Sequence, residues 1–425
     1  MPHSPLALKL RMSEHGKRQK LSQTVRGLTV SAKRTAWPFM TVSGRIAFLP
    51  WVTLPKAANV FGFKFVPVRL DDCKRVFGAE IAEPAAKAIG THVTQSSTPI
   101  DSCTVILRPR AALPWHVPEQ QWRRAWQAAS VLSLCCLSEQ EFMKGHFSAH
   151  LNASMFRPVS MAVSEGSQHI GLYYPRRGGG LRVGGRTFSD LVFQQPSQIE
   201  GTRCDVVNVR LAEALRKAQR TGHEVWNRVE QSLNYFHLAN AETPDLSEAH
   251  CLALSAVAFE RLLAPKLPNA QGLAEALADL WRAFPYKALA QAKRIKPDDD
   301  PKFAAQQQAW PLRRKWMKEL YEGRSSHVHR GPMGAFSQNW LPWQHAVIAA
   351  FVFPLAVKLQ LSAAGFYAMS QDEQVACEVL DDLLDSHWGN GWRRPPEWPG
   401  VLSEARAMRS RRAVVQKIIE KLSAS

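Results

Sequence analysis

The hydrophobic pattern of the chain changes near Cys204, and this change limits the possible folds more than any other feature. From about Trp37 to Cys204, apolar residues come in short or alternating runs that turn residues separate. Such runs are typical of β-strands. After Cys204, apolar residues recur at helical spacing over longer segments, which favours amphipathic helices. The pattern therefore predicts a multidomain α+β protein, in which a strand-rich, mixed α/β domain precedes an all-α helical bundle.

Four segments are expected along the chain. Residues 1–35 hold eight Lys or Arg residues and one acidic residue, so we expect a flexible basic arm. Residues 36–205 are expected to form the α+β domain, which would bind or sense a ligand that the sequence does not name. Residues 206–386 are expected to form the helical domain. Residues 387–425 combine a linker rich in Gly, Pro and Trp with a basic, amphipathic helix at the C-terminus.

The expected elements follow from these patterns. The strand candidates are short apolar or alternating runs at 41–49, 61–70, 103–107, 159–163, 169–174 and 187–193. One helix, roughly Pro118 to Leu134, interrupts them. The tract Arg176–Gly180 matches no phosphate-binding loop and indicates a hairpin tip with solvated arginines. The helical half is expected to form a bundle of about five main helices. The segments at helical spacing are 207–221, 224–241, 245–263, 273–284, 303–328, 343–368 and 372–385. Asp245 is expected as an N-cap, and a bend is expected near Pro311.

Charge and cysteine content suggest where such a chain works and what it meets. The 425 residues carry a formal net charge of +18. A polyanionic partner is the first hypothesis, because Lys and Arg gain affinity by releasing counterions from phosphates. An anionic membrane surface and a solvated basic surface are the alternatives. The seven cysteines form no Cys-x-x-Cys pair, which excludes a recognisable zinc module and favours free thiols in a cytoplasmic protein.

Two segments are apolar or amphipathic enough for contact with a membrane to be considered. Ala346–Val357 is wholly apolar, but Lys358 and Gln360 interrupt the run that follows it. Its uninterrupted part is too short to cross a bilayer, so a buried core helix is expected rather than a membrane span. The C-terminal helix, Leu402–Leu422, is expected to dock on the body of the protein. Contact with a phosphate backbone or with a membrane surface is the alternative for this helix.

The most informative cluster of chemical groups lies near residue 324. Within six residues the chain places Arg324, His327 and His329. A guanidinium keeps its charge and holds phosphate with two hydrogen bonds, and a histidine accepts or gives a proton near neutrality. RNA cleavage through the 2′-hydroxyl needs a fixed cation and a group that transfers protons, and it needs no metal. The cluster therefore indicates a nuclease site, although its spacing alone is a weak signal.

The surroundings of the cluster strengthen this interpretation. The pattern Trp316-x3-Leu320-Tyr321-x2-Arg324-Ser325-x3-His329 resembles the motif of the HEPN superfamily, in particular its Apea-like branch. Flanking segments are similar to the helices that surround the motif in that family. These segments are Trp226–Ala239, Ala253–Leu263, the long apolar helix and Asp381–Leu384. The resemblance covers roughly Val207 to Ser386, which is under half of the chain.

The resemblance implies a metal-independent endoribonuclease without a cofactor, or a non-catalytic relative that binds RNA or protein. Members commonly act as homodimers, and many serve in antiviral defence or toxin systems. Carried over by position, Arg324 would bind phosphate and His329 would be the general acid/base, with His327 as the alternative. Ser325 and Glu260 would support the site, Glu260 by holding Arg324. The residues expected to bind RNA are Arg313, Arg314 and Arg330, of which Arg330 departs from the family by separating His329 from Gly331.

Helix geometry leaves three alternatives for the catalytic pair. Five residues along a straight helix correspond to a rotation of about 140°, so Arg324 and His329 would lie on different faces. His327 would lie beside Arg324 instead. Either the helix ends between Arg324 and His329, or a second subunit completes the site, or His327 is the working histidine. The Gly331-Pro332 stop signal favours the first alternative.

Other candidates for chemistry are weaker, and they include an acidic run and the pair His146 and His150, which has no third ligand nearby. Asp298-Asp299-Asp300 has the ligand type of a hard cation, but three consecutive acids on a polar loop more often form a solvated turn. No metal site is therefore expected. The sequence predicts a cytoplasmic protein that cleaves RNA, and the resemblance to the HEPN superfamily implies that it acts as a homodimer. Neither the RNA nor the trigger follows from the sequence.

Overall fold

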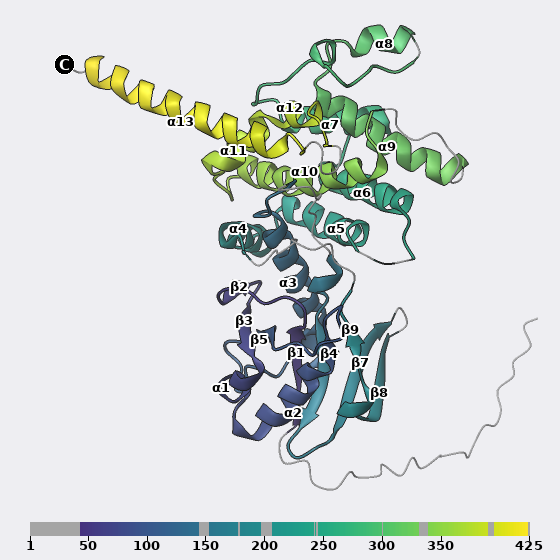
Figure 1. Cartoon of the computed structure of the whole chain (residues 1–425), viewed down its shortest axis with the longest axis vertical. Coiled ribbons are helices and arrows are strands. Elements are labelled where there is room, and N and C mark those ends of the chain that lie inside the picture. The colour runs from purple at the N-terminus through teal and green to yellow at the C-terminus, as the bar shows by residue number, and fades with distance from the viewer. Residues whose placement is uncertain are drawn as a thin grey trace, which may run out of the picture. The chain divides into compact units, whose positions relative to one another are not determined.

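The computed structural model describes residues 43–143, 153–176, 179–196, 206–241, 243, 245–299, 301–330, 339–389 and 395–423, with the side chains at 170, 172–185, 325–330, 417 and 421–423 left out. Thr41–Ser425 form one compact unit. The expected basic arm, residues 1–35, lies outside the described residues. The fold is mixed α+β, with a strand-rich N-terminal region followed by a helical C-terminal region (Figure 1).

A seven-stranded sheet organises the N-terminal region. Its strand order is β2-β3-β5-β1-β6-β7-β8, and every pairing within it is antiparallel. The strands are β1 (Ser43–Leu49), β2 (Ala58–Val60), β3 (Phe63–Arg69), β5 (Ser102–Leu107), β6 (Val159–Ser164), β7 (His169–Arg176) and β8 (Gly179–Thr187). Two short strands, β4 (His92–Val93) and β9 (Phe193–Gln194), form a separate parallel pair.

Both faces of the central strand β1 are buried because its side chains alternate between two cores. Ile46 and Phe48 face helices α1 (Cys73–Phe77) and α2 (Ala79–Gly90). Ala47 and Leu49 belong to the core that includes helix α3 (Glu119–Leu137). The sheet is therefore covered by helices on both faces. Figure 1 shows α3 between the sheet and the helical region.

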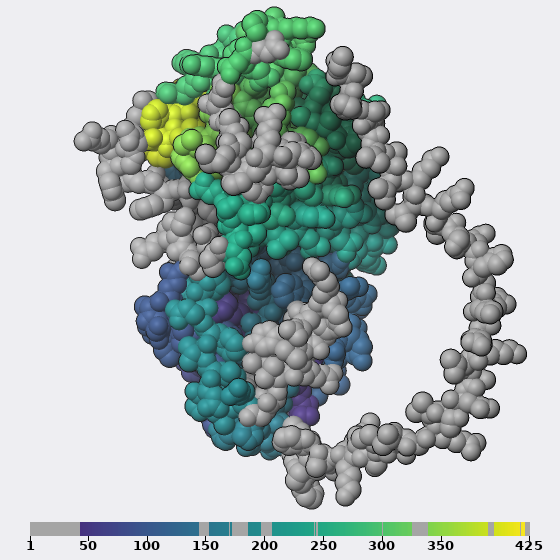
Figure 2. Space-filling model, turned by 90° about the vertical axis from the view of Figure 1, so that its right-hand side faces the viewer, coloured from purple at the N-terminus to yellow at the C-terminus, as the bar shows by residue number. Residues whose placement is uncertain are grey.

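The helical region is built around one long apolar helix. Helix α10 contacts α3, α4, α5, α6 and α7. The helices are α4 (Val209–Arg220), α5 (Glu224–Ala239), α6 (Glu248–Leu263), α7 (Ala270–Leu280), α8 (Pro301–Gln307), α9 (Leu312–Arg330), α10 (Pro342–Ala363), α11 (Gln371–Glu378), α12 (Leu380–Leu384) and α13 (Trp398–Ser423). The same hydrophobic core holds residues of α3, α4, α6, α9 and α10. Figure 2 shows the strand-rich and helical regions in direct contact.

Among the described helices, α10 alone is long and apolar enough to cross a membrane. However, 72% of its most apolar 18-residue stretch is buried inside the protein. Its most hydrophobic residues pack against neighbouring helices; Phe353, for example, stacks on Phe236 with ring centroids 4.0 Å apart. The expected core helix at this position is confirmed, and the described residues contain no clear membrane span.

Several expected elements agree with the structure, and others need correction. The hairpin at the glycine tract is confirmed as β7 and β8, although positions 177–178 lie outside the described residues. The helix expected at 303–328 is two helices, α8 and α9, because Pro311 has no backbone N–H and ends the helical bonding before Leu312. Ser247, rather than Asp245, caps α6, since its hydroxyl accepts a hydrogen bond from the His250 amide. Helices α1 and α2 were not expected.

Candidate functional site

Helix α9 carries the residues on which the sequence analysis centred. Its inward side is apolar: Leu312, Trp316, Met317 and Leu320 are fully buried, and they pack in the groove between α6 and α7. This packing fixes the rotation of α9 about its axis. Arg324 follows one turn after Leu320, at the border between the packed face and solvent, with 28% of its side chain exposed.

Arg324 is held by two neighbours. Its guanidinium forms an ion pair with the carboxylate of Glu260 on α6, and its Cζ lies 5.0 Å from the centre of the Tyr321 ring. Tyr321 is itself fixed, because its hydroxyl donates a hydrogen bond to the carbonyl of Pro268 at 3.0 Å. The expected contact between Glu260 and Arg324 is therefore present. The guanidinium is oriented in advance, and part of it remains accessible to a ligand.

Helix α9 does not end between Arg324 and His329; it continues to Arg330. The alternative that an early helix end brings these two residues together is therefore wrong. No residue between them lacks a backbone N–H, so nothing interrupts the helical hydrogen bonds before the Gly331-Pro332 stop. On a continuous helix, His329 is rotated by about 140° from Arg324 and His327 by about 60°. The side chains at 325–330, including those of Ser325, His327, His329 and Arg330, lie outside the described residues.

Arg313 does not take the RNA-binding role that the sequence predicted for it. It is 1% exposed, and its Nε and Nη2 donate to the two carboxylate oxygens of Asp381, each at 2.9 Å. The amide of Lys287 donates to the same carboxylate at 2.9 Å. A buried guanidinium that is already paired on both sides cannot reach a phosphate. Arg313 joins α9 to α12 and is a structural residue.

Arg314 lies on another side of α9 and is partly accessible. Its Nη2 is 2.8 Å from Glu275 on α7, and 21% of its side chain is exposed. Its Cζ also lies 4.1 Å from the centre of the Trp310 ring. A phosphate would have to compete with Glu275 for this arginine. RNA binding by Arg314 stays a prediction.

In the acidic run, Asp298 is not a solvated turn residue, and Asp300 lies outside the described residues. Asp298 accepts hydrogen bonds from Lys315, Lys318 and Gln307. Burial opposes ionisation, but these partners outweigh it and lower the pKa of Asp298 to about 2. The cluster ties the loop before α8 to α9. No group of three or more His, Cys, Asp and Glu side chains that could hold a metal ion occurs among the described residues.

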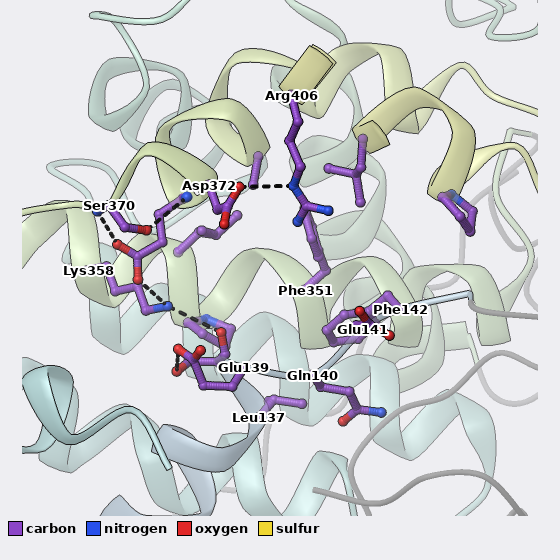
Figure 3. A pocket seen from close by; sticks show the side chains of 17 residues that line it. Leu137, Glu139, Gln140, Glu141, Phe142, Phe351, Lys358, Ser370, Asp372 and Arg406 are labelled. Atoms are coloured by element: carbon purple, nitrogen blue, oxygen red, sulfur yellow. Dashed lines mark hydrogen bonds and ion pairs between the residues drawn. The ribbon is translucent and has the colours of Figure 1, made fainter. Parts of the chain in front are cut away.

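A cavity of about 400 Å³ lies elsewhere in the helical region, where the end of α3 meets α10, α11 and α13 (Figure 3). Lys358, which is 2% exposed at its side chain, places its Nζ 2.7 Å from Glu373. Burial raises the pKa of Glu373, but Lys358 and the hydroxyl of Tyr367 outweigh it, so the pKa stays below its ordinary value. Arg406 and Asp372 pair at 3.0 Å on the rim.

In the sequence, Lys358 stands out only as an interruption of an apolar run. That interruption was the available signal, because a lysine inside a buried helix requires a partner. Here the partners come from α11 and from the carbonyl of Ser138, which accepts from Lys358 Nζ at 3.3 Å. Lys358, Glu373 and the carbonyl of Ser138 therefore satisfy one another within the protein, and they indicate no particular ligand.

Comparison with known proteins gives no match to a protein family, to a curated protein or to a solved structure. The resemblance to the HEPN superfamily therefore depends on the motif and on the order of the helices around it.

Proposed function

We propose that this protein is a metal-independent endoribonuclease of the HEPN type, and that Arg324 binds the phosphate to be cleaved. The observation that supports the proposal is the environment of Arg324. It is an always-charged group on a well-packed helix, oriented by Glu260 and Tyr321 and still partly exposed. Such an oriented cation stabilises the charge that develops on a phosphorane without further reorganisation.

The reaction would need one base and one acid besides this cation. A histidine removes the proton of the 2′-hydroxyl, and the 2′-oxygen attacks the phosphorus. The bond to the 5′-oxygen breaks, a protonated histidine supplies the proton to that oxygen, and a 2′,3′-cyclic phosphate remains. His327 and His329 lie in the last turn of α9. The negative end of the helix dipole favours the protonated imidazole there.

Because α9 is continuous, His327 and His329 correspond to two different active-site arrangements, one within a single subunit and one shared by two subunits. His327 is the histidine that a single subunit can place beside Arg324, because the two are three residues apart. His329 lies about 140° around the helix axis from Arg324, and we assign it to a phosphate held by Arg324 of a second subunit. We propose the second arrangement, a homodimer in which each site combines the arginine of one chain with His329 of the other.

Cleavage of a single-stranded RNA in the presence of a chelator tests the proposal. The full-length protein should produce ends with 2′,3′-cyclic phosphate, and Arg324→Ala should abolish cutting. Arg261→Ala is the matched control, since Arg261 is an exposed arginine on α6 next to Glu260. Equal loss of cutting in both variants, or undiminished cutting by Arg324→Ala, would contradict the role of Arg324.

Mixing two inactive variants tests the shared site. Arg324→Ala and His329→Ala should each be inactive alone. A mixed dimer should regain activity, because one of its two sites then combines an intact arginine with an intact histidine. Failure to regain activity, together with loss of cutting in His327→Ala, would assign the reaction to His327 within one subunit.

One observation favours a second function, in which the fold binds RNA or a protein without cleaving. The ion pair with Glu260 already balances the charge of Arg324, and an incoming phosphate must replace or share this partner. In that case no RNA would be cut, whereas RNA would bind with strong salt dependence. Glu260→Gln separates the two functions: in a nuclease it changes the rate of cutting, and in a binding module it strengthens binding alone.

The cellular role that we propose follows the domain order. The strand-rich region would sense a trigger ligand and restrain the helical nuclease, as a cytoplasmic antiviral defence protein requires. The contact of α3 with the sheet strand β2 and with α4, α5 and α10 supports this, because a change in the sheet can reach the helical region through one element. Adding phage lysate to the cutting assay of the full-length protein tests the restraint, because a trigger ligand should raise the rate of cutting.

A further inference from the structure

A groove of about 690 Å³ lies at the border of the strand-rich region, away from the helix that carries Arg324. The turn between β2 and β3, the segment that follows β5, and helices α3 and α4 form its walls. Figure 1 shows β2 next to α4, and these two elements are in contact. Four arginines line the groove, each from a different position on the walls: Arg108, Arg110, Arg124 and Arg216.

Among the described residues, no carboxylate forms an ion pair with the arginines of this groove. Arg110, Arg124 and Arg216 are exposed. Arg108 donates to the carbonyl of His116 at 3.4 Å, which leaves its charge intact. The groove has one acidic lining residue, Glu213. By contrast, Arg313, Arg314 and Arg324 each pair with a carboxylate.

Contacts between the walls hold together the elements that carry the arginines. Gln219 of α4 donates to Gln127 of α3 at 3.3 Å. The ring of Phe61, at the β2–β3 turn, packs on Trp226 with centroids 4.9 Å apart. Phe61 has a φ of +50°, a conformation that non-glycine residues adopt rarely and that the surrounding packing must hold in place. Four like charges gathered on these walls repel one another, and an anion that binds between them removes this repulsion.

We propose that this arginine groove binds a ligand that carries closely spaced phosphate groups. A planar guanidinium matches two phosphate oxygens at once, and four of them suffice for two or three phosphates. The volume is within the range of pockets that hold small ligands. A nucleotide with a phosphate chain and the backbone of a short RNA share this chemistry. The site is separate from Arg324, so the proposal holds whether or not the protein cleaves RNA.

Binding to the full-length Arg324→Ala protein tests the proposal without interference from cleavage. The probes are inorganic tripolyphosphate, ATP and a ten-nucleotide RNA with no terminal phosphate, measured by calorimetry. We expect at least one probe to bind, and Arg124→Glu or Arg216→Glu to weaken it tenfold or more. ATP and tripolyphosphate binding with no RNA binding would assign the groove to a small phosphorylated ligand, and RNA binding alone would assign it to a strand.

The matched controls are Arg123→Glu and Arg220→Glu. Both are exposed arginines on the same two helices, and neither lines the groove. They change the net charge of the chain by the same amount as the groove variants, so they should alter binding less than twofold. Equal weakening by groove and control variants, or the absence of binding by all three probes, would overturn the proposal. A cutting assay on Arg124→Glu with Arg324 intact separates this result from a failure of the nuclease proposal.

Discussion

The arginines of α9 look alike in the sequence but have different environments in the fold. Arg313 is buried against Asp381, Arg314 covers Trp310, and Arg324 is partly exposed beside Glu260. The position of Arg324 and its support from Glu260 could be predicted from the sequence. The burial of Arg313, which was expected to bind RNA, could not, because the helical period is weak in this polar helix and does not show which face packs inward. The partner of Arg313 lies 68 positions away, and nothing in the sequence links the two.

Replacing Arg313 should therefore affect folding far more than RNA binding. Arg313→Ala leaves the carboxylate of Asp381, which is 3% exposed, without its charged partner. Removing one member of a buried pair costs about 3–5 kcal/mol of the free energy of unfolding. Urea unfolding measures this loss, with Arg314→Ala as control at about 1 kcal/mol or less, because its pair with Glu275 is partly exposed. Similar stability of the two variants would contradict the buried pair.

Three histidines withdrawn from water should make the fold sensitive to mild acid. Burial lowers the pKa of His345 to about 3 and the pKa values of His92 and His237 to about 4. All three stay neutral in the folded chain while the unfolded chain takes up protons below about pH 6.5, so stability falls as pH falls through this window. Asp298, Asp385 and Glu373 have lowered pKa values, so their contributions are lost only below about pH 4.

Urea unfolding at pH 7 and at pH 5 measures the contribution of the histidines to stability alone, because these carboxylates do not titrate between these two pH values. The free energy of unfolding should fall by up to about 2 kcal/mol per histidine between the two values. His345→Phe keeps an aromatic ring beside Trp316 and Trp340. It should remove the part of the fall in the free energy of unfolding that His345 causes. An unchanged pH dependence in this variant would show that His345 is not neutral and buried as the structure places it.

Among the elements, those with a strong period were predictable and those with conflicting signals were not. Helix α3 and the strands β1, β3, β5 and β6 follow from clear patterns. Helix α2 was missed, because Pro84 within it is usually a signal against a helix. The buried side of α2 carries Ile81 and Ile89 together with Ala85 and Ala88, so an apolar stripe was present in the sequence and the proline masked it. The helix boundary at Pro311 was noticed but was interpreted as a bend.

Helix α13 should be divided into a docked and an undocked part. Trp398 at its start is fully buried, and Arg409 pairs with Glu378 of α11 at 2.9 Å. From Arg411 to Glu420, every described side chain is exposed, including those of Val415 and Ile419. The expected docking is therefore present for the first part of the helix. Figure 1 shows the remainder extending beyond α11.

Two changes test this division. Deletion of residues 411–425 should change the free energy of unfolding by less than about 1 kcal/mol, because no described side chain there is buried. Trp398→Ala should cost about 3–5 kcal/mol, as removal of a buried tryptophan does. Thermal unfolding compares the two variants with the full chain. A large loss on deletion would mean that the distal part of α13 packs against the body.

For the whole molecule, the relation between the two regions was beyond the reach of the sequence. The change of pattern near Cys204 marks the transition from strands to helices correctly, since the last described strand is β9 and α4 begins at Val209. Yet Ala47 and Phe65 of the sheet share one core with Leu132 of α3 and with Phe353 of α10. Periodicity shows which face of an element is apolar, but not which partner covers it.

A shared core predicts that the two regions unfold together. Leu132 of α3 is fully buried in this core, so Leu132→Ala should cost about 2–5 kcal/mol. Native-state hydrogen exchange should show this loss equally for amides of β1 and of α10, because one cooperative unit opens as a whole. Arg123→Ala, an exposed change on the same helix, should leave both unchanged. If the amides of α10 kept their protection while those of β1 lost it, the regions would be independent domains, and α3 could not transmit a signal between them.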